Sequence, residues 1–443
     1  MSKEHRWLAT ELERWTADGL ITADQASRLR ARYPVEPRDP AAPPWGVIVF
    51  FALGAVVVGL GVILLFAYNW SAIPKAGKLA LVFGAIAAAH GAGVTLRARD
   101  DWRSMLGEGT LLLGTMLFGA GIWLVAQIYH IDEHFPTGFL VWGLGALALA
   151  WAIPSIPQAI VATLVLAIWG SVEVLDFGNS VDWAVLILAG GVGSLAWRLR
   201  SALLAAIVLA AVHVQVLAHA AHWGGAGTAF TAAVAVSVTL LGLAELTRDA
   251  SGAARISRVL RFFGLCGFLI CAYVLTFAEA AEDVLRAAVR HRDGALMAAL
   301  YRWTLFGAGL VAWAIVFARK IRMQLGPGPT EHWFYPLGLV CVIAGSTWGV
   351  YEDGALVAVV FNLIVLGLAA LWIVQGCREA RLRDVVIGSV LLGMLVFARY
   401  FDLFDSLAAR GLAFVLFGAA LFAEGFFYRA MRRGRAGAER GSP

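Results

Sequence analysis

The sequence predicts an all-α membrane protein, a polytopic transmembrane helix bundle of about fourteen spans, on three observations. The 443-residue chain is 60% hydrophobic and 15% charged, whereas charged residues make up about a quarter of a typical soluble domain. Its apolar residues are gathered into long runs, and its lysines and arginines lie mainly between those runs. Because the basic residues form no single patch with interleaved aromatics, the net charge of +5 indicates membrane topology and not nucleic-acid binding.

Residues 1–34 predict a short cytosolic helical hairpin, followed by a Pro-rich linker over residues 35–44. Gly19 suits the end of the first helix, and Thr22 and Gln25 have the spacing of a capping box at the start of the second. Two such short helices are marginal alone, so we expect the hairpin to dock on the bundle or on an envelope protein partner. Apolar residues recur at helical spacing in the first helix: Trp7, Leu8, Leu12 and Trp15.

Residues 45–428 predict the transmembrane bundle, and residues 429–443 form a basic cytosolic tail. A helix needs about 20 apolar residues to cross about 30 Å of hydrocarbon. The sixth, tenth, eleventh and thirteenth spans are short, so we expect them to be tilted, broken or partly re-entrant. The expected spans are 45–68, 78–96, 105–127, 137–153, 157–175, 183–197, 202–221, 229–246, 262–281, 303–318, 335–350, 355–375, 385–398 and 411–428.

The distribution of basic residues predicts that both termini are cytosolic. Most of the 35 lysines and arginines fall in the two terminal segments and in the loops that this orientation places inside. The exception is the segment 282–302, which carries four arginines on the outer side. We interpret it as an amphipathic helix lying at the outer membrane surface.

A repeat links the first and third spans. Residues 53–70 align without gaps to residues 113–130, and the matched glycines include Gly54 with Gly114. The first and third spans run in the same direction, so the repeat suggests a duplicated two-helix hairpin. Small residues at the matched positions let helix backbones approach closely. The alternative is that glycine-rich membrane helices resemble one another by composition alone.

Polar and aromatic residues gather where the first, third and thirteenth spans reach the outer side. We interpret them as the lining of an outward-facing vestibule that binds a substrate, or as an interfacial cap with its aromatics at headgroup depth. Two histidines and an aspartate alternate in the stretch QIYHIDEHFP, but a flexible loop rarely holds a metal without further ligands, so we expect no metal and no cofactor. The vestibule candidates are Asn69, Gln127, Tyr129, His130, Asp132, His134, Arg399, Tyr400 and Asp402.

Four short motifs together resemble the domain of unknown function 2157 family of predicted bacterial membrane proteins. They are AYNW at the end of the first span, QIYHI at the end of the third, RYFD after the thirteenth, and GLITADQASRLRARY near the N-terminus. The resemblance implies a bacterial inner-membrane protein. It implies no activity, so it assigns no role to any residue.

The span number, the partial repeat and the polar outer ends favour a transporter-like function, a carrier or flippase for a small or lipidic substrate. One alternative is an accessory protein that stabilises an envelope complex. Another is a membrane enzyme acting on an outer-leaflet lipid-linked substrate, with an acid or base among His130, Asp132, His134 and Asp402. Nucleophile elbows, Walker loops and kinase signatures are absent from the sequence. Membrane lipids are the expected partners in every case.

Overall fold

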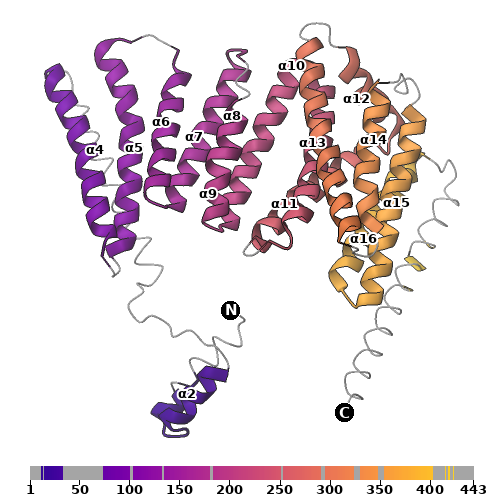
Figure 1. The fold of residues 1–443 in the computed structure, drawn as a ribbon, viewed down its shortest axis with the longest axis horizontal. Coiled ribbons are helices and arrows are strands. Elements are labelled where there is room, and N and C mark those ends of the chain that lie inside the picture. The colour runs from indigo at the N-terminus through magenta and orange to yellow at the C-terminus, as the bar shows by residue number, and fades with distance from the viewer. Residues whose placement is uncertain are drawn as a thin grey trace. The chain divides into compact units, whose positions relative to one another are not determined.

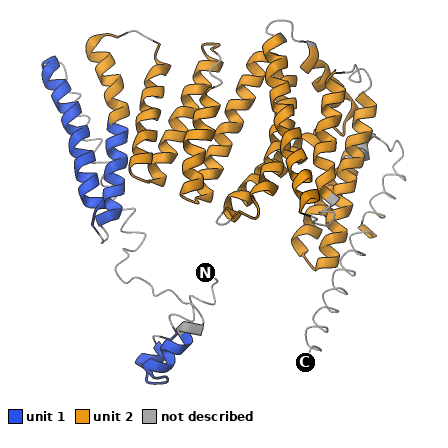
Figure 2. Cartoon of the chain, in the orientation of Figure 1, with its two compact units in different colours: residues 1–117 blue, residues 118–443 orange. Residues whose placement is uncertain are grey.

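The computed structural model describes residues 11–12, 14–32, 73–99, 103–131, 134–179, 183–250, 253–290, 295–323, 330–347 and 354–402, with 415, 418–419 and 423. These residues form helices and no strand (Figure 1), which confirms the all-α class. The chain divides into two compact units, residues 1–117 and residues 118–443 (Figure 2). Each unit is described by itself.

The helices of the first unit are α2 (Ala23–Arg32), α4 (Lys75–Arg97) and the beginning of α5 (Arg103–Tyr129). The predicted capping box of α2 is confirmed, because the Thr22 N–H donates to Gln25 Oε1 at 2.9 Å and the Gln25 N–H donates to Thr22 Oγ1 at 3.2 Å. Gly19 has the positive φ, 72°, that the end of the preceding helix requires. Residues 1–10 lie outside the described residues, so the complete hairpin stays a prediction.

Glycines set the close packing of α4 against α5. A Cβ added to Gly93 would lie 2.8 Å from the backbone nitrogen of Leu111, and one added to Gly114 would collide with the His90 ring. Gly114 therefore supports the expected role of the repeat's glycines in close helix packing. The first copy of the repeat, residues 53–70, lies outside the described residues, so the duplication itself stays a prediction.

The second unit holds the remainder of α5 and all later helices. They are α6 (Pro136–Ala152), α7 (Ile156–Leu175), α8 (Trp183–Leu186), the π-helical η2 (Ile187–Val192), α9 (Gly193–Arg198), α10 (Ala202–Thr247), α11 (Ala254–Val274), α12 (Ala278–Arg290), α13 (Ala295–Arg322), the 3-10 helix η3 (Thr330–Trp333), α14 (Phe334–Thr347), α15 (Gly354–Glu379) and α16 (Leu382–Asp402).

Seven helices in the described part of the chain are long and apolar enough to cross a membrane. Two further apolar helical segments, Pro136–Ala152 and Trp183–Arg198, are shorter. The structure therefore confirms a polytopic helical protein but does not confirm the count of about 14. The predicted first span, 45–68, lies outside the described residues, as does most of the last, 411–428. The seven are α4, α5, α7, α10, α11, most of α13 and α15.

The longest helix, α10, is a helical hairpin. Its backbone breaks at Gly224 and at Gly225, whose φ of 69° and ψ of −169° lie outside the range of ordinary L-residues. Val216 and Leu240 share one buried apolar cluster, although an unbroken helix would hold them roughly 36 Å apart. The chain therefore folds back at the two glycines, and α10 holds the two predicted spans 202–221 and 229–246.

The sixth predicted span, 183–197, departs from a regular α-helix, as its short length led us to expect. It consists of α8, η2 and α9, so its centre is π-helical. The indole of Trp151 donates to the Gly191 carbonyl at 3.0 Å within the π-helical stretch. A side chain from α6 thus stabilises the irregular turn.

The segment 282–302 forms the later part of α12 and, from Ala295, the beginning of α13. α12 is amphipathic as expected. Its residues Ala281 and Leu285 are completely buried, and α12 packs against α10, α14 and α15; its position at the outer membrane surface stays a prediction. Its apolar face thus covers protein. The close fit depends on Gly227 of α10, where an added Cβ would collide with the backbone of α12 at Ala288.

Candidate functional site

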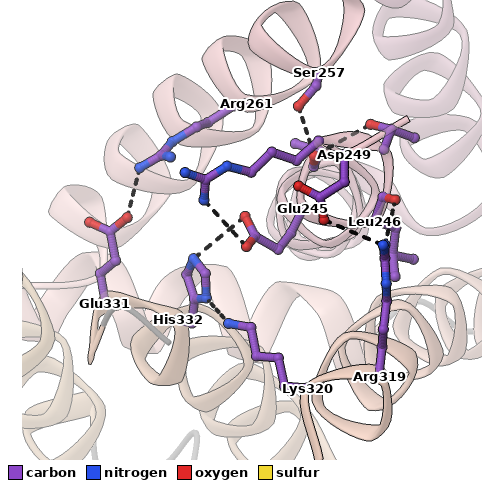
Figure 3. Close-up of polar contacts among 12 residues, drawn as sticks. Glu245, Leu246, Asp249, Ser257, Arg261, Arg319, Lys320, Glu331 and His332 are labelled. Carbon is purple, nitrogen blue, oxygen red and sulfur yellow. Dashed lines mark hydrogen bonds and ion pairs between the residues drawn. The ribbon is translucent and has the colours of Figure 1, made fainter. Parts of the chain in front are cut away.

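A pocket of about 270 Å³ lies within the second unit, where α10 and α13 end and where α11, η3 and α14 begin. We call it the charged pocket; Figure 3 shows its polar contacts. Apolar walls come from Leu241, Ala244, Ala254 and Trp313. Its polar residues are Glu245, Arg248, Ser257, Arg258, Arg261, Glu331, His332 and Tyr335.

Glu331 is the buried anionic centre of the charged pocket. It is 4% exposed, and Arg261 Nη2 of α11 donates to its Oε1 at 2.7 Å. The indole N–H of Trp372, on α15, donates to its Oε2. A buried carboxylate is stable only with such donors. Glu331 thus ties η3 to both α11 and α15.

His332 lies beside Glu331 and is held in one neutral tautomer. Lys320 Nζ of α13 donates to its Nδ1 at 2.5 Å, which leaves the proton on Nε2. That Nε2 lies 3.7 Å from Glu245 Oε2, beyond hydrogen-bond distance. Burial, and then the nearby Lys320 charge, lower the pKa of His332 from 6.5 to about 4. At neutral pH the imidazole is therefore an uncharged N–H donor.

Tyr335, the second residue of α14, contributes a buried hydroxyl to the charged pocket. The residue is 2% exposed, and its ring packs edge-on against Phe268 with centroids 5.2 Å apart. Its hydroxyl has no hydrogen-bond partner among the described residues. A buried hydroxyl in that state costs about 1–3 kcal/mol unless water or a ligand bonds to it. The hydroxyl therefore marks a place for a polar atom that the described residues do not supply.

Three arginines give the charged pocket its cationic side. Arg248 Nη1 lies 3.6 Å from Glu245 Oε1, and Arg261 bonds to Glu331. Arg258 donates from Nε to the Ala254 carbonyl at 3.3 Å, and no carboxylate in the described part of the chain pairs with its guanidinium. The lining thus holds three guanidinium groups against two carboxylates, with Lys320 a further cation behind His332.

Arg319 fixes the turn after α10. Its guanidinium donates to the Leu246 carbonyl at 3.1 Å and to Asp249 Oδ2 at 3.3 Å (Figure 3). Ser257, at the start of α11, donates to the Ala244 carbonyl at 2.8 Å. These bonds hold the helix ends that carry Arg248 and Arg258.

The predicted vestibule residues are only partly described. Gln127 and Tyr129 end α5, and Tyr129 is half exposed. His130 follows with φ of 55°, where the Ile131 N–H closes the helix on the Ala126 carbonyl at 2.9 Å. The other candidates do not test the vestibule, which stays a prediction. Asn69 and Asp132 lie outside the described residues, and Arg399, Tyr400 and Asp402 are described only as the backbone of α16.

His134 has a specific partner that the vestibule hypothesis did not include. Its Nε2 lies 2.8 Å from both carboxylate oxygens of Glu173, on α7. Asn179 Nδ2 and Trp169 Nε1 donate to the same carboxylate at 2.9 and 3.2 Å. Glu173 is buried, so this cluster ties the turn before α6 to the end of α7. Over the described ranges no three His, Cys, Asp or Glu residues are placed to hold a metal ion.

Sequence reasoning missed the charged pocket because we assigned the basic residues of this end to membrane topology. The available signal was the loop PGPTEHW, which places Glu331 and His332 directly before a span, together with Glu245 at the end of another. Acidic residues and a histidine among the arginines that set membrane orientation indicate a candidate functional site.

The fold defines the class: a helical membrane protein, with a charged pocket at one end of its C-terminal helices. Residues 13–158 match a family model described as predicted membrane protein (DUF2157). The match confirms the resemblance and covers three of the four motifs that carry it; the fourth, RYFD, lies outside the matched residues. No curated protein and no solved structure matches the chain. The charged pocket lies beyond the matched residues, so its chemistry is argued from the structure alone.

Proposed function

We propose that this membrane protein binds a ligand bearing a phosphate or similar anionic group in the charged pocket, at the cytosolic face of a bacterial inner membrane. The observation that carries the proposal is the buried Tyr335 hydroxyl, which has no partner among the described residues and lines the charged pocket beside Arg248, Arg258 and Arg261. This site, and not the outer vestibule, is the basis of the function proposed.

The proposed orientation rests on the positive-inside rule, which also predicts that both termini are cytosolic. Helices α10, α13 and α15 end, and α11, α14 and α16 begin, at the end that holds the charged pocket. Basic residues concentrate in the three connections there. At the opposite end the segment 282–302 carries four arginines, and the connection between α14 and α15 carries none. The basic residues at the end that holds the charged pocket are Arg248, Arg255, Arg258, Arg261, Arg319, Lys320, Arg322, Arg378, Arg381 and Arg383.

The donors of the charged pocket favour a ligand rich in acceptor oxygens. The Arg258 guanidinium, the His332 Nε2–H and the Tyr335 hydroxyl can all donate, and guanidinium groups match phosphate oxygens in a bidentate geometry. A cation is disfavoured because Glu331 is already bonded to Arg261 and Trp372, and Glu245 faces Arg248. The same phosphate chemistry is found in a free anion and in a lipid headgroup, for which the apolar wall residues Leu241 and Trp313 suit the attached chain.

This binding step is compatible with the transporter-like function that the sequence suggests. A carrier or flippase would bind its substrate here before releasing it on the outer side near Tyr129 and His130. An accessory protein of an envelope complex would use the same pocket to hold a structural lipid. We propose ligand binding, and neither transport nor an accessory role, because binding requires only the residues of the charged pocket.

Titration of the purified protein in nanodiscs tests the proposal. In one arm, inorganic phosphate and sulfate are titrated by calorimetry into protein in phosphatidylcholine. In the other, the discs also contain phosphatidylglycerol, and native mass spectrometry counts the lipid retained. Loss of one hydrogen bond to a charged ligand costs about 1.5–3 kcal/mol, so Tyr335→Phe and Arg258→Gln should each weaken binding by about tenfold or more.

Arg322→Gln is the matched control, since Arg322 is an exposed basic residue at the end of α13 that does not line the charged pocket. It should leave affinity unchanged. Binding of free anions assigns a soluble ligand, and retention of phosphatidylglycerol alone assigns a lipid headgroup. If neither ligand binds, or if the control weakens binding as much as Tyr335→Phe, the proposal is wrong.

A further inference from the structure

We infer that ligand binding in the charged pocket is coupled to the uptake of one proton by His332. The inference rests on the proposed anion binding and adds a coupling ion to it. It starts from the position of His332, whose Nε2 lies in the charged pocket while its Nδ1 is bonded to Lys320.

Burial of the ring, and then the excess of cations around it, hold His332 neutral by lowering its pKa. Only 4% of the residue is exposed, and the Trp313 ring covers it edge-on with centroids 5.5 Å apart. The charged and titratable groups around it come from every packed element: Glu245 and Arg248 of α10, Arg261 of α11, Lys320 of α13, Glu331 of η3 and Tyr335 of α14.

An anion in the charged pocket reverses this balance. It would lie against the His332 Nε2–H, where an opposite charge within about 4–6 Å moves a pKa by roughly 1–3 pH units. Starting from about 4, the pKa of His332 then rises into the range where the ring is protonated in mildly acidic solution. The proton comes from bulk water at the cytosolic side.

Protonation also changes the role of Lys320. The imidazolium carries a proton on each ring nitrogen and accepts no hydrogen bond, so the bond from Lys320 Nζ to Nδ1 is lost. The occupied site thus holds one proton more than the empty one, and by linkage its affinity for the ligand increases as the pH falls.

Calorimetry with sulfate tests the coupling, because the charge of sulfate is constant between pH 5.5 and pH 8. Titrations in buffers of different ionisation enthalpy measure the protons taken up per sulfate bound. For the wild type we expect uptake approaching one proton near pH 6, and an affinity about tenfold higher at pH 5.5 than at pH 8. Where only phosphatidylglycerol binds, its retention at the two pH values replaces the sulfate affinity.

Two variants distinguish proton uptake by His332 from proton uptake by its neighbours. His332→Gln should still bind the anion, with no proton uptake and little dependence on pH. Lys320→Met keeps the imidazole but removes the cation bonded to it, so His332 should be partly protonated before binding and the uptake near pH 6 should decrease. The second variant supplies the test if the first does not fold.

Three results would overturn the inference. The wild type could bind sulfate without taking up a proton, in which case the anion site stands and only the coupling fails. Proton uptake could persist in His332→Gln and disappear in Glu245→Gln, which would place the proton on the carboxylate. The wild type could bind neither anion nor lipid at any pH, and then the proposed function fails as well.

Discussion

Replacing Arg261 with methionine should destabilise the C-terminal helices by about 2–3 kcal/mol, because it leaves the buried Glu331 carboxylate with one donor. Removing one partner of a buried ion pair costs about 3–5 kcal/mol when both charges are fully buried. Here the Glu331 side chain is 5% exposed, but that of Arg261 is 45% exposed. Water already screens the guanidinium, so the expected cost is about 2–3 kcal/mol, at or just below the bottom of that range.

A double-mutant cycle isolates this charge pair. Glu331→Gln keeps a carbonyl acceptor for the Trp372 indole but removes the negative charge, so the double variant Arg261→Met with Glu331→Gln has no unpaired buried charge. We expect the double variant to regain about 1–2 kcal/mol relative to Arg261→Met alone. Thermal or SDS-induced unfolding of the purified protein, followed by circular dichroism, measures all three variants.

Arg381→Met is the matched control. Arg381 pairs with Glu379 at 2.8 Å, but the two side chains are 67% and 44% exposed, so the pair contributes about 1 kcal/mol or less. If Arg381→Met and Arg261→Met destabilise the protein equally, or if the cycle gives no coupling energy, the buried ion pair between Glu331 and Arg261 does not stabilise the C-terminal helices.

Three further predictions concern packing, pH and topology. Gly227→Ala should cost about 1–3 kcal/mol because the atoms nearest to the added Cβ are all backbone atoms of α12. Gly307→Ala meets open space, so it should change the unfolding free energy by less than about 1 kcal/mol. Since the pKa of His332 is lowered from 6.5 to about 4, its neutral form contributes stability that is complete above pH 6.5 and is lost as the pH falls toward 4. The unfolding free energy should therefore decrease by about 2 kcal/mol between pH 7 and pH 5. This decrease should be absent in His332→Gln. If the decrease persists in that variant, it does not come from His332. Single cysteines at Tyr129 and Arg322, in a chain without its four native cysteines, should be labelled from opposite sides of the membrane. If both are labelled from the same side, the proposed topology is wrong.

The helical class was predictable because composition alone excludes a soluble core, and local chemistry was predictable where it depends on neighbours in sequence. The bonds between Thr22 and Gln25 are such a case, since they join residues three apart. The number of spans was not predictable in the same way. Length and hydropathy do not distinguish a regular helix from the π-helical centre of α8–α9, nor a lipid-facing amphipathic helix from α12, whose apolar face covers protein.

The charged pocket was not predictable because its partners are distant in sequence. Arg261 and Glu331 are 70 residues apart, and Glu331 and Trp372 are 41 apart. The same holds for His134 and Glu173, which are 39 residues apart. Sequence spacing indicates which residues share a helix face, whereas these pairs depend on how separate helices pack. The polar residues near His134 were visible in the sequence, whereas the charged pocket, at the other end of the helices, was not.

The tie between Glu331 and Trp372 has a consequence for biogenesis. Trp372 lies 41 residues after Glu331, so the ribosome synthesises α15 after α11 and η3. Until then the Glu331 carboxylate lacks its indole donor, and a nascent or truncated chain cannot complete the site.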